Sequence, residues 1–315
     1  MSKKTIYQVV LPLITAFIWG SSFVSQSLAS GSVGTFFFNA ARSLIASIEL
    51  LALALVLRKL HPSGRSAEEE RAYRRELLRG ALLCGTVFTV AANLQQFGIE
   101  SNTSSGKAGF ITALYIVIVP ILGFLLLHQK VGRFVWLAVA LALVGLYLLC
   151  FEPGTSLRFT NGDLYIFLCA VFFSVHILAI DHFTKRVDGV ELSCAQFIVQ
   201  MVLCLILGLL FDHSTRFSAI VAATPYILYV GVLSSGVGYT LQILAQKEGD
   251  PTIVSLLLSF EAFFAAVSGA VILHERLSLR ETVGCAVMLV AVFLAQIPDH
   301  STKQVIKGDE KSHAD

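Results

Sequence analysis

The chain contains an internal repeat that aligns without a gap: residues 80–150 match residues 226–296 at a constant offset of 146. Both copies are almost entirely apolar. Identical residues are spread over their length, at Leu82/Leu228, Gly85/Gly231, Gln96/Gln242, Gly123/Gly269, Leu127/Leu273, His128/His274, Ala140/Ala286 and Leu143/Leu289. A repeat of this kind in an apolar chain predicts two related helix bundles that meet at an interface, where repeat-built membrane proteins hold their ligands.

The scarcity of charge is a second constraint. Of the 315 residues, 56% are hydrophobic and 14% are charged, whereas a water-soluble domain has about 25% charged residues. The apolar residues form runs of about 20, the length that crosses a bilayer as a helix. Lipid offers the backbone no hydrogen-bond partners, so these runs must be helical, and the alternation typical of membrane barrels is absent. The sequence therefore predicts an all-α membrane protein with ten transmembrane helices, at 8–29, 35–57, 78–99, 108–127, 133–151, 161–181, 191–211, 224–245, 252–273 and 279–297.

The distribution of basic residues predicts the orientation. If the N-terminus is cytoplasmic, 17 of the 23 Lys and Arg residues lie in inner segments, five lie in outer segments, and Arg42 lies within a span. This bias follows the positive-inside rule, so we expect both termini in the cytoplasm of a multi-pass plasma-membrane protein, such as one of a bacterial inner membrane. Because each half has five spans, the two repeats are expected to be inverted, related by a pseudo-twofold axis in the membrane plane.

The expected organisation follows from these spans. Residues 1–151 form the first repeat, 152–298 the second, and 299–315 a disordered cytoplasmic tail. The polar segment 58–79, rich in Arg and Glu, interrupts the first repeat. We expect a solvated cytoplasmic loop there; a surface helix that binds anionic headgroups is the alternative.

Two polar stripes occupy matching positions in the repeats. Thr89, Asn93 and Gln96 in the third span are spaced by 4 and 3, which places them on one helical face. At an offset of 146, Ser235, Tyr239 and Gln242 in the eighth span repeat the spacing. Hydrogen bonds that join the helices are one interpretation. Opposite walls of one cavity are the interpretation that the symmetry favours.

The first span adds a further polar face. Trp19, Ser22 and Gln26 are spaced by 3 and 4, and Trp19 lies too deep for a residue of the interfacial aromatic belt. Packing against small neighbours and a place in the cavity wall both fit this pattern.

Glu261 is the most conspicuous ionisable residue within a span. It lies about 14 Å from one end of its predicted helix, so its carboxyl group must be protonated, paired or exposed to water. It can bind a substrate ammonium group or carry a proton; a neutral Glu that bonds to a neighbouring helix is the alternative. Its repeat mate is Tyr115, which hydrogen-bonds without carrying charge.

Three other ionisable residues lie within spans. Arg42 and Glu49 are seven residues apart on one face, and each can extend to its own interface or pair structurally. Arg42 can alternatively hold a substrate carboxylate with its guanidinium fork. His176, near the cytoplasmic end of the sixth span, is expected to be a structural histidine.

Pro120 lies in the middle of the fourth span, where it removes a backbone hydrogen bond and is expected to kink the helix. Its mate Ala266 has neither effect. The kink can serve as a hinge or as a static bend.

The motifs of both halves resemble the EamA family of the drug/metabolite transporter superfamily. Trp19-Gly20-Ser21-Ser22-Phe23 and Phe38-Asn39-Ala40-Ala41-Arg42 lie in the first two spans. Ser259-Phe260-Glu261-Ala262-Phe263 stands where Glu-Pro-Val is usual, His274-Glu275-Arg276 replaces Gly-Glu-Arg, and Gly284 matches the closing-helix glycine. The similarity covers residues 8–297. It implies ten helices, cytoplasmic termini and transport of small organic solutes, commonly amino acids or related metabolites and often outward.

These observations predict a secondary transporter that exports small metabolites such as amino acids. Protons are one candidate for the coupling ion. The expected cavity residues are Trp19, Ser22, Gln26, Arg42, Asn93, Gln96, Tyr115, Tyr239, Gln242 and Glu261. Metabolite uptake, efflux of lipophilic cations and a non-transporting scaffold or sensor are the alternatives, and a homodimer is left open. Catalytic motifs such as His-Glu-x-x-His and Gly-x-Ser-x-Gly are absent, and the six cysteines have no metal-ligand spacing. We therefore expect neither an enzyme, nor a metal or cofactor, nor a nucleic-acid partner.

Overall fold

The computed structural model describes residues 6–30, 33–62, 64–101, 105–127, 132–150, 160–213, 215–272, 278–295 and 297. All regular elements of these residues are helices. Those of the first half are η1 (Ile6–Val10), α2 (Leu11–Ala29), α3 (Thr35–Leu60), α4 (Ala67–Glu100), α5 (Ser105–Thr112), α6 (Tyr115–Leu127) and α7 (Arg133–Cys150). Those of the second half are α8 (Asn161–Thr184), α9 (Gly189–Phe211), α10 (Phe217–Ala222), α11 (Thr224–Leu228), η2 (Tyr229–Gly238), α12 (Tyr239–Glu248), α13 (Pro251–Leu258), α14 (Glu261–Ile272) and α15 (Leu279–Ala295).

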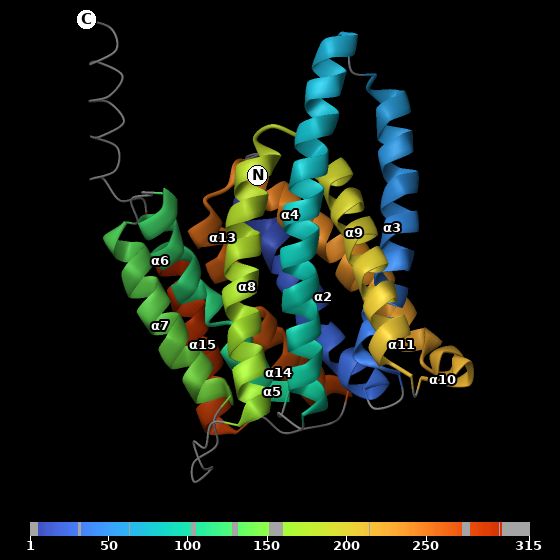
Figure 1. The fold of residues 1–315 in the computed structure, drawn as a ribbon. Coiled ribbons are helices and arrows are strands. Elements are labelled where there is room, and N and C mark those ends of the chain that lie inside the picture. Colours follow the sequence, from blue (N-terminus) through green and yellow to red (C-terminus); the bar gives the residue numbers. More distant parts are fainter. Residues whose placement is uncertain are drawn as a thin grey trace, which may run out of the picture.

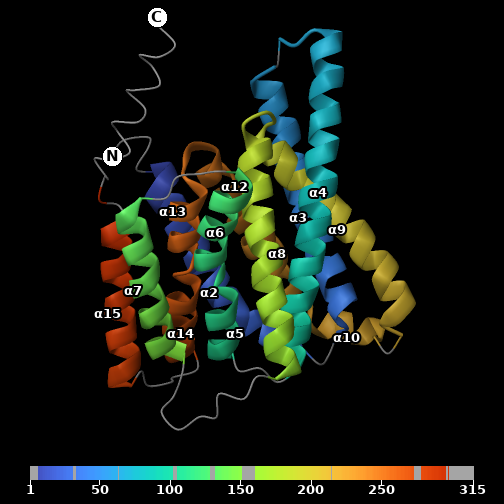
Figure 2. The ribbon, with the colours of Figure 1, turned by 60° about the vertical axis from the view of Figure 1, so that its left-hand side comes forward.

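The helices form an upright bundle of membrane-spanning dimensions (Figures 1 and 2). Six segments are long and apolar enough to cross a bilayer: Ile6–Ala29, Thr35–Leu60, Ala67–Glu100, Asn161–Thr184, Gly189–Phe211 and Thr224–Glu248. Shorter apolar helices lie at Tyr115–Leu126, Arg133–Gly145, Pro251–Ala265 and Thr282–Ala291, within the other predicted spans. The prediction of an all-helical, membrane-embedded chain is confirmed for the part of the chain described.

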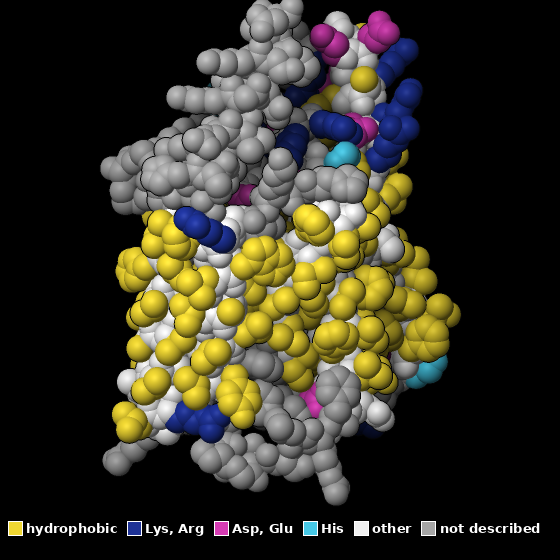
Figure 3. Space-filling model, turned by 90° about the vertical axis from the view of Figure 1, so that its left-hand side faces the viewer, with side chains coloured by type: hydrophobic (Ala, Val, Ile, Leu, Met, Phe, Trp, Pro, Cys, Tyr) yellow, Lys and Arg dark blue, Asp and Glu magenta, His cyan; other side chains and the backbone are white. Residues whose placement is uncertain are grey.

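The outer surface has the polarity that a bilayer requires. Figure 3 shows a belt of hydrophobic side chains around the middle of one face, with charged side chains gathered near its two ends. Phe124, Leu126 and Phe293 are 59–71% exposed. A water-soluble monomer rarely shows an apolar surface this continuous, whereas lipid favours it.

The polar segment 58–79 is largely helical, and the prediction of a loop there is wrong. Only residues 61–66 separate α3 from α4, and the two helices extend beyond the rest of the bundle (Figure 1). Ser66 caps α4: its side chain accepts from the Glu69 N–H, while the Glu69 carboxylate accepts from the Ser66 N–H. This capping box satisfies backbone donors at the helix start. The 34 residues of α4 span about 51 Å, which exceeds a hydrocarbon core of about 30 Å.

Two helix breaks occur at equivalent positions of the repeat. The first separates α5 from α6 at residues 113–114, and the second separates α13 from α14 at residues 259–260, an offset of 146. Tight backbone bonds mark both breaks, Ile116 N–H to Ala113 C=O and Ala262 N–H to Ser259 C=O. Pro120 lies inside α6, beyond the break. The second copy breaks at the equivalent place without a proline, so these breaks do not require Pro120.

The eighth span departs from regular α-helix. Residues 229–238 form a π-helix, η2, between α11 and α12. A π-helix advances one extra residue per hydrogen-bonded turn and therefore changes which side chains share a face. Its α-helical counterpart in the first repeat is part of α4.

Candidate functional site: a cavity between the two halves

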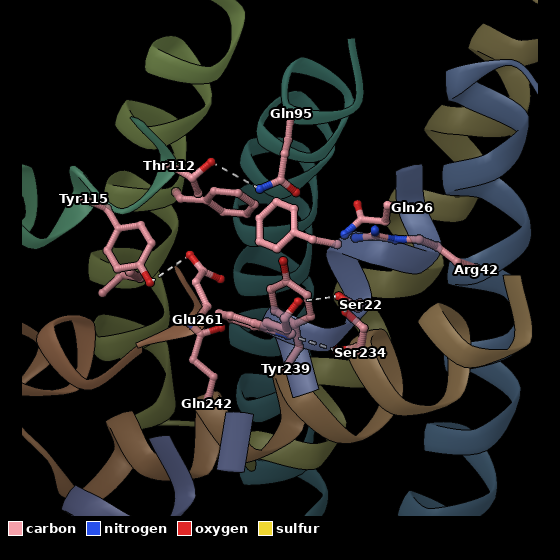
Figure 4. A pocket seen from close by; sticks show the side chains of 14 residues that line it. Ser22, Gln26, Arg42, Gln95, Thr112, Tyr115, Ser234, Tyr239, Gln242 and Glu261 are labelled. Atoms are coloured by element: carbon pink, nitrogen blue, oxygen red, sulfur yellow. Dashed lines mark hydrogen bonds between the residues drawn. The ribbon is translucent and has the colours of Figure 1, made fainter. Parts of the chain in front are cut away.

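A cavity with about 470 Å³ of empty space, open solvent included, lies between helices of the bundle (Figure 4). Helices of both halves line it, through Trp19, Ser22, Phe23, Gln26, Arg42, Gln95, Thr112, Tyr115, Phe173, Ile177, Ser234, Tyr239, Gln242 and Glu261. Eight of the ten residues predicted from the sequence are among them; Asn93 and Gln96 are not.

The two helix breaks meet at this cavity. Tyr115 is the first residue of α6 and Glu261 is the first residue of α14, so both side chains leave the chain where a helix restarts. The Tyr115 hydroxyl donates to Glu261 Oε1 across 3.2 Å. Glu261 is 4% exposed, and the positive end of the α14 dipole favours its carboxylate. The carboxyl group is therefore held inside the membrane by a neutral partner.

Close packing of α2 against α14 fixes the position of Glu261. A Cβ atom on Gly20 would lie 2.5 Å from the Glu261 carbonyl oxygen and 2.7 Å from the Ala265 backbone nitrogen. Only glycine permits the two backbones to approach this closely. The neighbouring Trp19 consequently reaches across the cavity, where its Nε1–H donates to the Ser234 carbonyl over 3.2 Å.

Aromatic rings and a cation form the wall opposite Glu261. Trp19 and Tyr239 lie with their ring centroids 4.5 Å apart, and Tyr239 packs edge-on against Phe88. Arg42 lies beside the Tyr239 hydroxyl and is 3% exposed. Its Nε has no hydrogen-bond partner. Figure 4 shows Arg42 and Glu261 on opposite sides of the cavity. Neither forms an ion pair with a residue that the structure describes.

The π-helix changes the register of the eighth span. The predicted stripe was Ser235, Tyr239 and Gln242, but the cavity takes Ser234 in place of Ser235. Ser234 precedes Tyr239 by five residues, the hydrogen-bond spacing of a π-helix, and its Oγ accepts from Ser22 Oγ over 3.4 Å. Gln242 is 1% exposed, and its Oε1 has no partner.

The matching stripe of the third span joins helices instead of lining the cavity. Asn93 Nδ2 donates to the Thr89 carbonyl over 2.7 Å and lies 3.3 Å from Cys204 Sγ of α9. Asn93 Oδ1 accepts from Asn39 Nδ2 of α3 over 3.0 Å. Asn93 therefore fits the helix-joining interpretation, while Gln95 is the polar residue of α4 in the cavity lining.

Five further cavity residues escaped the sequence analysis. Gln95 adjoins the predicted Gln96, and its Nε2 donates to Thr112 Oγ1 over 3.5 Å. Thr112 lies three residues before Tyr115, and Phe23 lies four after Trp19, spacings that helical periodicity could have identified. Phe173 and Ile177 are apolar residues of an apolar span and gave no signal.

The remaining embedded ionisable residues lie outside the cavity lining. Glu49 Oε2 is buried without a partner and lies against Gly236 of η2, so Arg42 and Glu49 do not pair. His176 is fully buried; its Nε2 lies 2.9 Å from Gln196 Oε1, and its ring stacks on Phe88. This is the structural histidine expected. Within the described residues no group of three or more His, Cys, Asp and Glu is placed to hold a metal ion.

The fold and the cavity together define a polytopic helical membrane protein with a candidate site, lined by one acidic and one basic side chain, between its two halves. Comparison with known proteins gives the family. The model of the EamA-like transporter family matches residues 6–151 and then residues 160–296. The chain belongs to this family, as the sequence motifs predicted.

Curated relatives and a solved structure agree with this membership. An "Uncharacterized transporter" of Archaeoglobus fulgidus is 24% identical over 93% of this chain and 87% of its own. A "Probable terminal-alkyne amino-acid exporter" of Streptantibioticus cattleyicolor is 25% identical over 75% of this chain and 74% of its own. A solved structure described only as "Crystal structure of protein" has a TM-score of 0.73 at 17% identity, covering 92% of this chain and 96% of that chain. That structure supports the fold alone.

Proposed function

We propose that the protein is a secondary transporter that exports small zwitterionic metabolites, amino acids or their relatives, through the central cavity. The observation that carries the proposal is that Glu261 and Arg42 line one cavity from opposite sides without pairing with each other (Figure 4). A buried charge without a counter-ion is costly. A solute with an ammonium group near Glu261 and a carboxylate near Arg42 satisfies both at once.

The architecture proposed for this activity is ten transmembrane helices in two inverted five-helix repeats, with both termini in the cytoplasm of the plasma membrane. The equal offset of the two helix breaks and the two successive family matches support it. Broken helices at the midplane of inverted repeats are a common way to build a substrate site. Rocking of one repeat against the other then exposes the cavity to each side in turn.

Glu261 is the proposed site of proton coupling. Tyr115 can donate to the carboxylate without neutralising its charge. The carboxylate is therefore free to exchange a proton for a substrate ammonium group as the cavity changes sides. Outward transport of an amino-acid-like solute is supported by the exporter named among the relatives.

A second candidate substrate class is lipophilic cations. Trp19, Tyr115 and Tyr239, together with two phenylalanines, line the same cavity as Glu261. Aromatic faces attract a desolvated cation. Such substrates require the carboxylate of Glu261 but have no carboxylate that would bind to Arg42.

One experiment tests the proposal and separates the two classes. The detergent-purified protein is heated with a panel of amino acids, their amides and quaternary ammonium compounds. A ligand of the folded state raises the apparent melting temperature. Stabilisation by amino acids, followed by their uptake into vesicles that contain the protein, supports the proposal. Stabilisation by quaternary cations alone identifies the second class. A protein that binds no solute of either class and transports none contradicts both.

A further inference from the structure

A group of buried oxygen atoms without hydrogen-bond partners lies where α3 begins and α4 ends. These atoms are Thr35 Oγ1, Asn39 Oδ1, Gln96 Oε1 and Glu100 Oε1. Thr35 and Asn39 are each 1% exposed, and Gln96 is 2% exposed. None of the four residues lines the central cavity. A buried acceptor left without a partner is unfavourable, so four such oxygens on one pair of helices indicate a ligand.

The four residues belong to one contact between antiparallel helices. Phe36 of α3 and Phe97 of α4 have ring centroids 5.3 Å apart. Thr35 and Gln96 both lie within hydrogen-bonding reach of the Glu100 carboxyl group. Asn39 is one helical turn from Thr35, and Gln96 is one turn from Glu100, a rise of about 6 Å in each case. On each of the two helices, the two residues therefore lie about one turn apart.

The electrostatic character of this place favours a cation. The four atoms are acceptors, and Glu100 contributes a carboxylate. The C-terminal end of α4 adds the partial negative charge of its unbonded carbonyl groups. The nearby Asp212 is already engaged, because its Oδ2 accepts from the Phe37 N–H over 2.9 Å and so offsets the positive end of α3.

We propose that Thr35, Asn39, Gln96 and Glu100 form a binding site for one monovalent cation, with Na⁺ the best match. A single carboxylate neutralises one positive charge. Ca²⁺ takes six to eight oxygen ligands, usually with several carboxylates. Glu100 is partly exposed and gives the ion a way in, while the other three side chains replace its water shell. The site is independent of the substrate proposed for the cavity.

The internal repeat supplies a natural variant of this site. At an offset of 146, Gln96 corresponds to Gln242 and Glu100 corresponds to Gln246. The second copy therefore carries an amide where the first carries a carboxylate. The substitution Glu100→Gln installs the side chain that the fold already accepts at the equivalent place, and it removes the charge that the cation requires.

The test is the thermal stability of the purified full-length protein in NaCl and in choline chloride of equal ionic strength. We expect Na⁺ to raise the apparent melting temperature in a saturable way, since a ligand of the folded state stabilises it. Glu100→Gln is expected to abolish the sodium-specific shift. Glu248→Gln removes an exposed carboxylate from the end of another helix, α12, and is expected to keep the full shift.

If Glu100→Gln folds poorly, a second variant tests the same site. Thr35→Val removes one ligand oxygen at nearly constant shape, and we expect it to raise the sodium concentration for half-maximal stabilisation by about tenfold. Equal melting temperatures in sodium and choline overturn the proposal, as does an unchanged sodium response of either variant; ordered water would then satisfy these oxygens. A larger, saturable shift with CaCl₂ overturns the assignment to a monovalent ion.

Discussion

Tyr115 and Glu261 hold equivalent positions in the two halves of the chain, 146 residues apart, and the Tyr115 hydroxyl donates directly to Glu261 Oε1 over 3.2 Å. Each is the first residue of a helix that restarts after a break. The two copies of the repeat therefore touch through a pair of matched residues that differ in chemistry. The second copy supplies the carboxyl group of Glu261 and the first supplies the neutral donor Tyr115. The repeat therefore places both side chains at the site, and the difference between them makes the site asymmetric.

The carboxyl group of Glu261 should set the pH response of transport. We expect Glu261→Gln to lose both the dependence on a pH gradient and the affinity for solutes with an ammonium group, because the amide neither titrates nor carries charge. The measurement is uptake into vesicles at several imposed pH gradients. Glu49→Gln changes another embedded carboxylate that lies outside the cavity lining and should keep the wild-type pH profile. An unchanged profile in Glu261→Gln would exclude the coupling role.

Gly20 should be irreplaceable at the contact between α2 and α14. A Cβ atom there would lie 2.5 Å from the Glu261 carbonyl oxygen, so Gly20→Ala must displace α14. We expect a loss of about 1–3 kcal/mol of stability, typical of overpacking, together with loss of ligand binding. Gly109→Ala is the control, because its Cβ would meet the nearest atom at 3.8 Å. Melting temperatures with and without ligand report both effects; equal behaviour of the two variants would refute the close contact.

The phase of the π-helix can be tested with two adjacent serines. Ser234 lines the cavity and accepts a hydrogen bond from Ser22, whereas Ser235 is buried outside the lining. Ser234→Ala should weaken ligand binding by about fivefold to tenfold, the equivalent of one hydrogen bond of about 1 kcal/mol. Ser235→Ala should leave ligand affinity unchanged. The reverse order of effects would mean that residues 229–238 are α-helical in the protein that binds ligand.

The helical extension of α3 and α4 should lose stability in acid. Hydrogen bonds from Arg74 and Arg58 hold the pKa of the Glu70 carboxyl below its usual range. A carboxyl whose pKa is lower in the folded state stabilises that state fully above its unfolded pKa, and the contribution disappears as the pH falls through the folded value. Proteolysis within residues 61–66 should therefore increase in acid. Glu70→Gln should show the increase already at neutral pH, whereas Glu68→Gln, which forms no ion pair in the described structure, should not.

The sequence predicted the parts of this site that depend on the repeat and on composition. Glu261 and Arg42 stood out because charge is rare in apolar spans, and Tyr115 followed from the offset of 146. The structure departs from the prediction where a change in backbone geometry alters which side chains face the cavity. Because η2 has one additional residue per hydrogen-bonded turn, Ser234 lines the cavity in place of Ser235. No residue type in the sequence predicts a π-helix. The orientation of α4 depends on its contacts with Asn39 and Cys204, which lie far away in the sequence.

The central claim is that Glu261 and Arg42 bind the opposite charges of one solute. The most direct measurement compares the binding of an amino acid substrate with that of its carboxamide and its N-acetyl derivative, by thermal shift, in wild type, Glu261→Gln and Arg42→Gln. The account predicts that wild type prefers the zwitterion, that Glu261→Gln loses its preference over the N-acetyl acid, and that Arg42→Gln loses its preference over the carboxamide. Equal losses for all three ligands in both variants, or an unchanged ranking, would contradict it.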